Sequence, residues 1–191
     1  GSNARIDGTL TDAASSEVVV KLLNSNRYEI LDTVKTNAAG QFTYKVDVAE
    51  GQPEFVYLFH NDRKVATLLL EAGDKVAVTT DALGNAVIEG SEESVKLMQV
   101  EREHAQMSYL FASLAAELET ATGAKAQQLT EQMGKEYRAY NRKSVKYVME
   151  NSHSLTAIPV LYRNLGSLPV FALHTDAVLF NAIAERYEAV K

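Results

Sequence analysis

Cysteine does not occur among the 191 residues of the chain, and tryptophan is absent as well. The lack of cysteine excludes disulfide bonds, thiolate nucleophiles, thiolate metal ligands and dithiol redox chemistry from these residues. Long apolar runs are also missing, since the longest candidates, 18–23 and 65–70, are far shorter than the roughly 18–20 residues that cross a bilayer. The sequence therefore predicts a soluble fragment without redox activity of its own.

Positive charge is not in excess either, because 19 Lys and Arg residues stand against 25 Asp and Glu residues, for a net charge of −6. Nucleic-acid binding depends on cationic side chains that neutralise phosphates, so we expect no nucleic-acid partner. The hydrophobic share of 46% and the charged share of 23% are those of a globular protein. The length allows one large domain or two small ones.

Residues 5–90 alternate between apolar and polar side chains with a period of two, which predicts half-buried antiparallel strands separated by short turns. In 41–46, for example, Phe42, Tyr44 and Val46 share one face. Strands that recur every 8–12 residues favour a sandwich of about seven or eight strands. The predicted strands are 5–11, 17–24, 28–36, 41–48, 54–59, 64–70, 75–80 and 86–89.

The period changes after Gly90, where Ser91 offers an N-cap hydroxyl and Glu92 and Glu93 place carboxylates in the first turn of a helix. Apolar and aromatic side chains then repeat at three- to four-residue spacing on both sides of Gly123, which predicts a helical hairpin. The repeat consists of Met107, Phe111, Leu114 and Leu118, and then Leu129, Met133, Tyr137, Tyr140, Val148 and the polar Ser144. Two further helices are expected over 155–165, with Pro159 in the first turn, and over 176–190.

The predicted fold is therefore α+β, with an N-terminal antiparallel β-sandwich followed by a helical hairpin and further helices. Residues 1–4, Gly-Ser-Asn-Ala, are typical of the remnant of a cleaved expression tag. We expect the sandwich to span 5–90 and the helical region 91–191. A helix still running at Lys191 suggests that the protein continues into a further domain.

Several short motifs of turn glycines and apolar strand residues occur in a characteristic order. They are Ile6-Asp7-Gly8-Thr9-Leu10, Asn37 with Gly40-Gln41-Phe42, Leu68-Leu69-Leu70-Glu71-Ala72-Gly73-Asp74 with Val76 and Val78, Ile88-Glu89-Gly90-Ser91, and finally 151–162. In this order they resemble the domain of unknown function that precedes the thioredoxin-like domain in Bacteroidetes-type envelope thiol–disulfide oxidoreductases. The resemblance implies an exported, lipid-anchored envelope protein whose redox chemistry lies in a C-terminal domain. Because the chain has no C-x-x-C, no catalytic residue is carried over.

Catalytic and metal-binding motifs are incomplete. Glu101 and His104 form an E-x-x-H pair, half of the motif that di-iron bundles use, but no second copy follows, so a solvated or capping role is expected. His60, His153 and His174 lack metal-ligand spacing and are expected at the surface, in turns or at helix ends. The serines at 91 and 167 lack a nucleophile elbow and are interpreted as an N-cap and a loop residue. No catalytic residue, cofactor or metal ligand is therefore predicted.

Two surfaces of the predicted hairpin are candidates for binding. The basic side chains of its second helix are interpreted as a solvated face balanced by Glu131, Glu136 and Glu150, with an anionic partner or membrane head groups as the alternative. The tyrosines and Phe111 are interpreted as packing residues, with an aromatic cleft between sandwich and hairpin as the alternative. The basic residues are Lys135, Arg138, Arg142, Lys143 and Lys146, and the tyrosines are Tyr109, Tyr137, Tyr140 and Tyr147.

Taken with the resemblance, these features predict a non-catalytic module that positions, or dimerises, an attached thioredoxin-like domain in the cell envelope. Membrane contact would come only from a lipid anchor upstream of the given residues. The alternative, from a different class, is a free-standing envelope module that binds a glycan, a peptide or another ligand.

Overall fold

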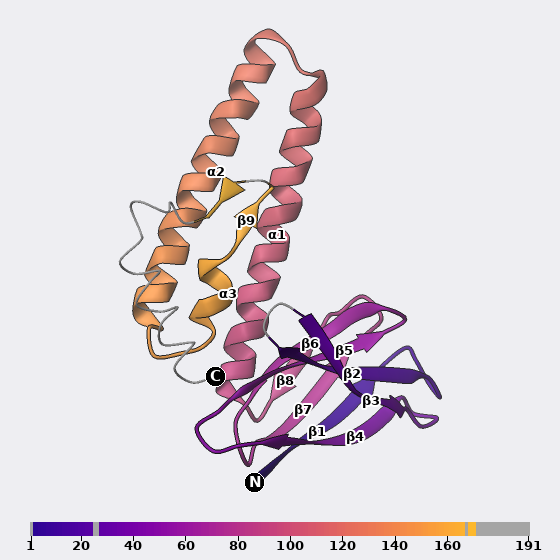
Figure 1. Cartoon of the computed structure of the whole chain (residues 1–191). Helices are drawn as coiled ribbons and strands as arrows, with labels where there is room; N and C mark the ends of the chain where they lie inside the picture. The colour runs from indigo at the N-terminus through magenta and orange to yellow at the C-terminus, as the bar shows by residue number, and fades with distance from the viewer. Residues whose placement is uncertain (1, 25–26, 167, 171–191) are drawn as a thin grey trace. The chain divides into compact units, whose positions relative to one another are not determined.

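The computed structural model describes residues 2–24, 27–166 and 168–170, which form two compact units divided after Gln99. The first unit contains eight strands in two four-stranded sheets, ordered β4-β1-β7-β8 and β3-β2-β5-β6 (Figure 1). The α+β class and the sandwich predicted from the sequence are confirmed. The strands are β1 (Ser2–Leu10), β2 (Glu17–Asn24), β3 (Arg27–Lys35), β4 (Gln41–Val48), β5 (Glu54–His60), β6 (Arg63–Leu70), β7 (Lys75–Thr80) and β8 (Val87–Glu89).

The pairing within the sheets differs from the prediction at one place. Strands β1 and β7 run parallel, with Ile6 opposite Val76 and Gly8 opposite Val78, whereas every other described pair is antiparallel. An all-antiparallel sandwich was therefore wrong for this pair. Both strands have the alternating pattern, and that pattern does not encode the direction of a neighbour that lies about seventy residues away in sequence.

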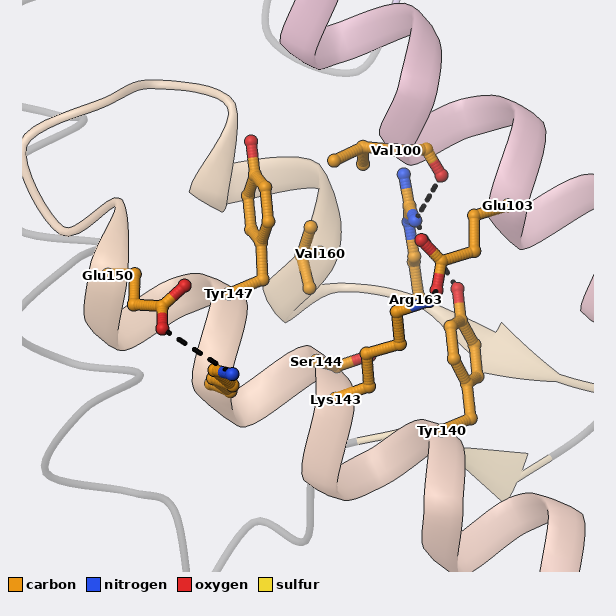
Figure 2. A pocket seen from close by; sticks show the side chains of 10 residues that line it. Val100, Glu103, Tyr140, Lys143, Ser144, Tyr147, Glu150, Val160 and Arg163 are labelled. Atoms are coloured by element: carbon orange, nitrogen blue, oxygen red, sulfur yellow. Dashed lines mark hydrogen bonds and ion pairs between the residues drawn. The ribbon is translucent and has the colours of Figure 1, made fainter.

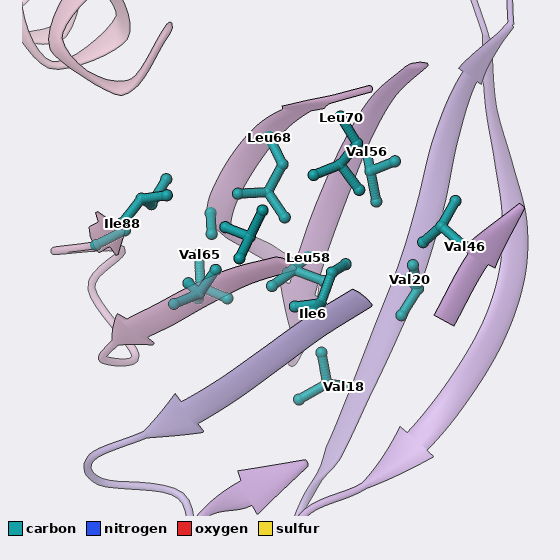
Figure 3. Packing of buried hydrophobic residues seen from close by; sticks show 14 of the residues in the cluster. Ile6, Val18, Val20, Val46, Val56, Leu58, Val65, Leu68, Leu70 and Ile88 are labelled. Atoms are coloured by element: carbon teal, nitrogen blue, oxygen red, sulfur yellow. The ribbon is translucent and has the colours of Figure 1, made fainter. Parts of the chain in front are cut away.

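The core of the first unit lies between the two sheets. Alternate side chains of each strand point inward, as expected for period-two strands, and fill this space with β-branched and leucine side chains (Figure 3). Ala4 is part of this core, and residues 2–4 of the segment interpreted as a tag remnant belong to β1. The fully buried core side chains include Ile6, Leu10, Val18, Val20, Val48, Leu58, Leu68 and Leu70.

One glycine is required by the turn that enters β4. Gly40 has φ of +76°, and a Cβ atom there would lie 2.0 Å from the carbonyl oxygen of Leu10. The Leu10 amide in turn donates to the Gly40 carbonyl at 2.8 Å. The Asn37 side-chain oxygen accepts from the amides of Ala39 and Gln41, both at 2.9 Å, and so closes the turn. The Asn37 to Gly40 motif is thus a backbone requirement of the sandwich.

The start of α1 (Glu92–Thr120) is bound to the edge of β6 by two serines. Ser91 is the N-cap, as predicted, since its Oγ accepts from the Ser94 amide at 3.1 Å. Ser94 Oγ donates to the Leu69 carbonyl and accepts from the Leu69 amide, each at 3.0 Å. The outer backbone groups of this edge residue are therefore satisfied. This attachment explains why the first compact unit extends to Gln99 rather than to residue 90.

The second unit contains the rest of α1, α2 (Gly123–Glu150), α3 (Ala157–Leu161), β9 (Asn164–Leu165) and β10 (Leu168–Pro169). The predicted hairpin is present, and α3 lies beside it (Figure 1). The helix predicted over 155–165 is wrong beyond Leu161, because Asn164 and Leu165 pair with Pro169 and Leu168 instead. Gly166, with φ of +61°, allows this turn. The helix predicted over 176–190 lies outside the described residues.

No helix among the described residues is both long enough and apolar enough to cross a bilayer.

Candidate ligand-binding site

A cavity of about 240 Å³ opens in the second unit, between α1, α2 and the segment that follows α3 (Figure 2). Its walls combine apolar groups with charged ones, which is typical of sites that hold small ligands. Helix α1 contributes Val100 and Glu103, and Val160 and Arg163 come from α3 and the residues after it. Helix α2 supplies Tyr140, Lys143, Ser144, Lys146, Tyr147 and Glu150.

Helical spacing explains why α2 contributes so many of these residues. Tyr140, Ser144 and Tyr147 lie three or four positions apart, so they share one face of the helix. The three- to four-residue repeat in the sequence predicted the burial of Tyr140 and Ser144, and both are buried. The lysines at 143 and 146 lie at the border of that face, and both are exposed.

Arg163 is the residue that connects α1, α2 and the end of α3. Its Nη1 donates to the Val100 carbonyl at 2.8 Å and to the Tyr140 hydroxyl at 3.3 Å. The Val100 carbonyl belongs to α1, and the hydroxyl belongs to α2. The guanidinium group therefore fixes one wall of the cavity.

The Tyr140 hydroxyl also reaches His104, whose Nδ1 lies 2.9 Å away. Since the hydroxyl oxygen accepts from Arg163, its proton is available to donate to Nδ1. The other ring nitrogen then carries the proton and lies 3.4 Å from Ser108 Oγ. Burial, together with the positive charge of Arg163, lowers the pKa of His104 from 6.5 to about 4. His104 is therefore neutral at pH 7, and burial raises the pKa of Tyr140.

The charges on the rim are partly paired. Lys143 Nζ lies 2.7 Å from Glu103 Oε1, and Lys146 lies 3.8 Å from Glu150. All five residues of the predicted basic face are exposed, as expected for a solvated face. Its pairing is only partly local, because Glu103 belongs to the other helix of the hairpin. The lining holds three cations and two carboxylates.

The E-x-x-H pair does not extend into a larger ligand cluster. His104 directs its two nitrogens toward Tyr140 and Ser108. Within the described ranges, no group of three or more His, Asp or Glu side chains is arranged to hold a metal ion. The geometry therefore assigns His104 to a hydrogen-bond network.

The prediction for His60 was wrong. This residue is the last of β5 and is only 6% exposed, with Nδ1 3.1 Å from the Glu17 carbonyl oxygen. The strand continues one residue further than expected because Asn61 and Asp62 form the turn with positive φ. His153 is exposed after α2, as expected. His174 and Ser167 lie outside the described residues.

The aromatic residues of the hairpin are divided between two environments. Phe111 and Tyr140 are buried, and the Tyr137 hydroxyl donates to the Pro169 carbonyl. The Tyr147 hydroxyl lies 2.6 Å from Thr156 Oγ1. Tyr109 is 78% exposed, so its predicted packing role was wrong. It lies two positions from Phe111, and residues at that spacing point to different sides of a helix.

Sequence reasoning did not identify Arg163. A single arginine after a five-residue helix has no motif, and its partners are 63 and 23 positions away. The cavity lining was predicted only as far as the buried face of α2.

The first unit is an eight-stranded sandwich, and the first turn of α1 covers its edge at β6. Residues 4–97 match the model of a family described as Domain of unknown function (DUF4369). The family resemblance seen in the sequence is confirmed over this segment. No curated protein matches the chain.

Proposed function

We propose that the chain is a non-catalytic accessory module of an envelope thiol–disulfide protein, in which it positions or dimerises an attached thioredoxin-like domain. The observation that supports this proposal is the family match over 4–97, because the motifs in this segment resemble those of the domain that precedes thioredoxin-like domains. The chain itself supplies no thiol. The redox step would therefore belong to cysteines outside these 191 residues.

The test is to sequence the native gene beyond the codon for Lys191 and upstream of the codon for Arg5. We expect an in-frame extension with a β-strand pattern and a C-x-x-C motif downstream, and a signal peptide with a lipidation site upstream. The longer protein should reduce insulin disulfides, whereas the 191-residue chain should not. A stop codon directly after Lys191 would overturn the accessory role.

A second candidate function is ligand binding by an envelope module, and the cavity of the hairpin favours it. A ligand present at 100 times its dissociation constant stabilises its protein by about 2.7 kcal/mol, which a thermal-shift screen detects. We expect at least one small ligand to raise the unfolding temperature. The absence of any shift across small acids, peptides and glycans would contradict this function.

A further inference from the structure

The floor of the cavity contains a hydroxyl group that has no hydrogen-bond partner among the described residues. Ser144 is only 4% exposed, and its Oγ makes no hydrogen bond to any described residue. Within the same residues, no fully enclosed side-chain nitrogen or oxygen lacks a partner. The Ser144 hydroxyl must therefore open onto the cavity that it lines (Figure 2). A buried polar group in this position is expected to be satisfied by a bound molecule or by water.

Arg163 has unused donors at the same cavity. Both of its hydrogen bonds to described residues come from Nη1, so Nη2 and Nε remain available. No described carboxylate lies within 4.0 Å of its guanidinium group, in contrast to Lys143 and Lys146. The three cations and two carboxylates of the lining leave one positive charge without a counterpart. A ligand with one negative charge would balance this excess.

We propose that the cavity binds the carboxylate group of a small apolar acid, with Ser144 and Arg163 as its hydrogen-bond donors. A planar guanidinium group matches the geometry of a carboxylate. The single surplus positive charge of the site also favours a monoanion over a dianion. The hydrocarbon part of the acid packs against Val100, Val160 and the ring of Tyr147. At about 240 Å³ the cavity is smaller than the roughly 300–1,000 Å³ of sites for drug-sized ligands, so the ligand is small. This inference rests on ligand binding as the second proposed function.

Two sources supply the same chemistry, namely a free short-chain acid and the C-terminal carboxylate of a short peptide. The first experiment is calorimetric titration of the 191-residue chain at pH 7 with hexanoate, hexylamine and 1-hexanol, which share one hydrocarbon chain. We expect hexanoate to bind at least about tenfold more tightly than the other two, because hydrogen bonds to a charged group contribute most to affinity. Dileucine with a free or an amidated C-terminus forms the second arm. Tighter binding of the free-acid peptide than of hexanoate would identify the peptide source, and the reverse would identify the free acid.

The decisive variant is Ser144→Ala. It should weaken hexanoate binding about tenfold or more, because it removes one donor to the carboxylate. It should leave the unfolding temperature unchanged, because the hydroxyl has no described protein partner to lose. Ser113→Ala is the matched control, since Ser113 lies on α1 with its Oγ donating to the Tyr109 carbonyl at 2.9 Å. It should bind hexanoate as the wild type does.

Equal affinity for hexanoate and 1-hexanol, or unchanged hexanoate affinity in Ser144→Ala, would overturn the carboxylate assignment while ligand binding itself remained. Failure of all the acids and peptides would also overturn it. The proposed ligand-binding function would fall separately, only if the wider thermal-shift screen showed no ligand either.

Discussion

The contact between Ser94 and the edge of β6 provides the sharpest test of how the sandwich is stabilised. Ser94 is fully buried, and its hydroxyl satisfies both the amide and the carbonyl of Leu69. Ser94→Ala leaves the buried Leu69 amide without an acceptor, whereas the Leu69 carbonyl keeps a donor in Ser91 Oγ at 3.3 Å. One unsatisfied buried group costs about 1–3 kcal/mol, so we expect the free energy of unfolding to fall by about 1–3 kcal/mol. Ser91→Ala should cost about 1 kcal/mol, the usual cost of losing an N-cap.

Urea unfolding followed by far-ultraviolet circular dichroism measures this loss, and hydrogen exchange locates it. Because the chain has two compact units, the transition to follow is that of the sandwich. The Leu69 amide should exchange faster in Ser94→Ala, since its acceptor is gone. Ser113→Ala, on a solvent-exposed part of α1, is the control and should change the free energy by less than about 0.5 kcal/mol. A Ser94→Ala variant as stable as this control would refute the role of the serine.

Two further predictions concern pH and backbone geometry. The pKa of His104 is lowered to about 4 in the folded protein, so between about pH 6.5 and pH 4 the histidine is protonated in the unfolded chain but neutral in the folded one. The unfolding temperature should therefore fall as pH drops from about 6.5 toward 4. His104→Gln should make this pH dependence of the unfolding temperature less steep, whereas His153→Gln, at an exposed position, is the control and should not change it. A His104→Gln variant with the wild-type pH dependence would contradict the buried hydrogen-bond network of His104. Gly40→Ala should destabilise the sandwich by at least about 2 kcal/mol more than Gly51→Ala in urea unfolding, and equal losses would be inconsistent with the close contact at Gly40. Both glycines have positive φ, but only at Gly40 would the added Cβ meet a backbone oxygen, whereas at Gly51 nothing lies within 4 Å.

The strands were predictable because a period of two is a local property of the sequence. The bounds of β2, β4 and β7 agree with the prediction residue for residue. Pairing is not local, and the parallel neighbours β1 and β7 could not be read from either strand alone. The helix predicted beyond Leu161 failed for a related reason. Leu165 fits a helical repeat, but it is buried through a hairpin that depends on Gly166.

The candidate site was predictable only in part. The burial of Tyr140 and Ser144 followed from helical spacing, but no sequence pattern indicated that the serine hydroxyl would have no hydrogen-bond partner among the described residues. The cavity beside this hydroxyl is formed only when Arg163 and Val160, which follow α2 in sequence, pack against the helix. The low pKa of His104 also depends on distant residues, because it results from burial and from the positive charge of Arg163, which lies in a separate segment. Electrostatic properties of this kind require three-dimensional contacts between residues that are distant in sequence.

The family match and the cavity give independent information about the chain. The matched segment ends at residue 97, before Val100, the first residue of the cavity lining. Gly40 and Ser94, which lie within the segment, make close backbone contacts that hold the sandwich together. A loss of carboxylate binding in Ser144→Ala would therefore be evidence about the helical unit alone. It would neither support nor weaken the accessory role, which is proposed from the family match. Conversely, a thioredoxin-like extension would place the redox chemistry in that extension, and the carboxylate proposal would still be decided by the hexanoate titration of Ser144→Ala.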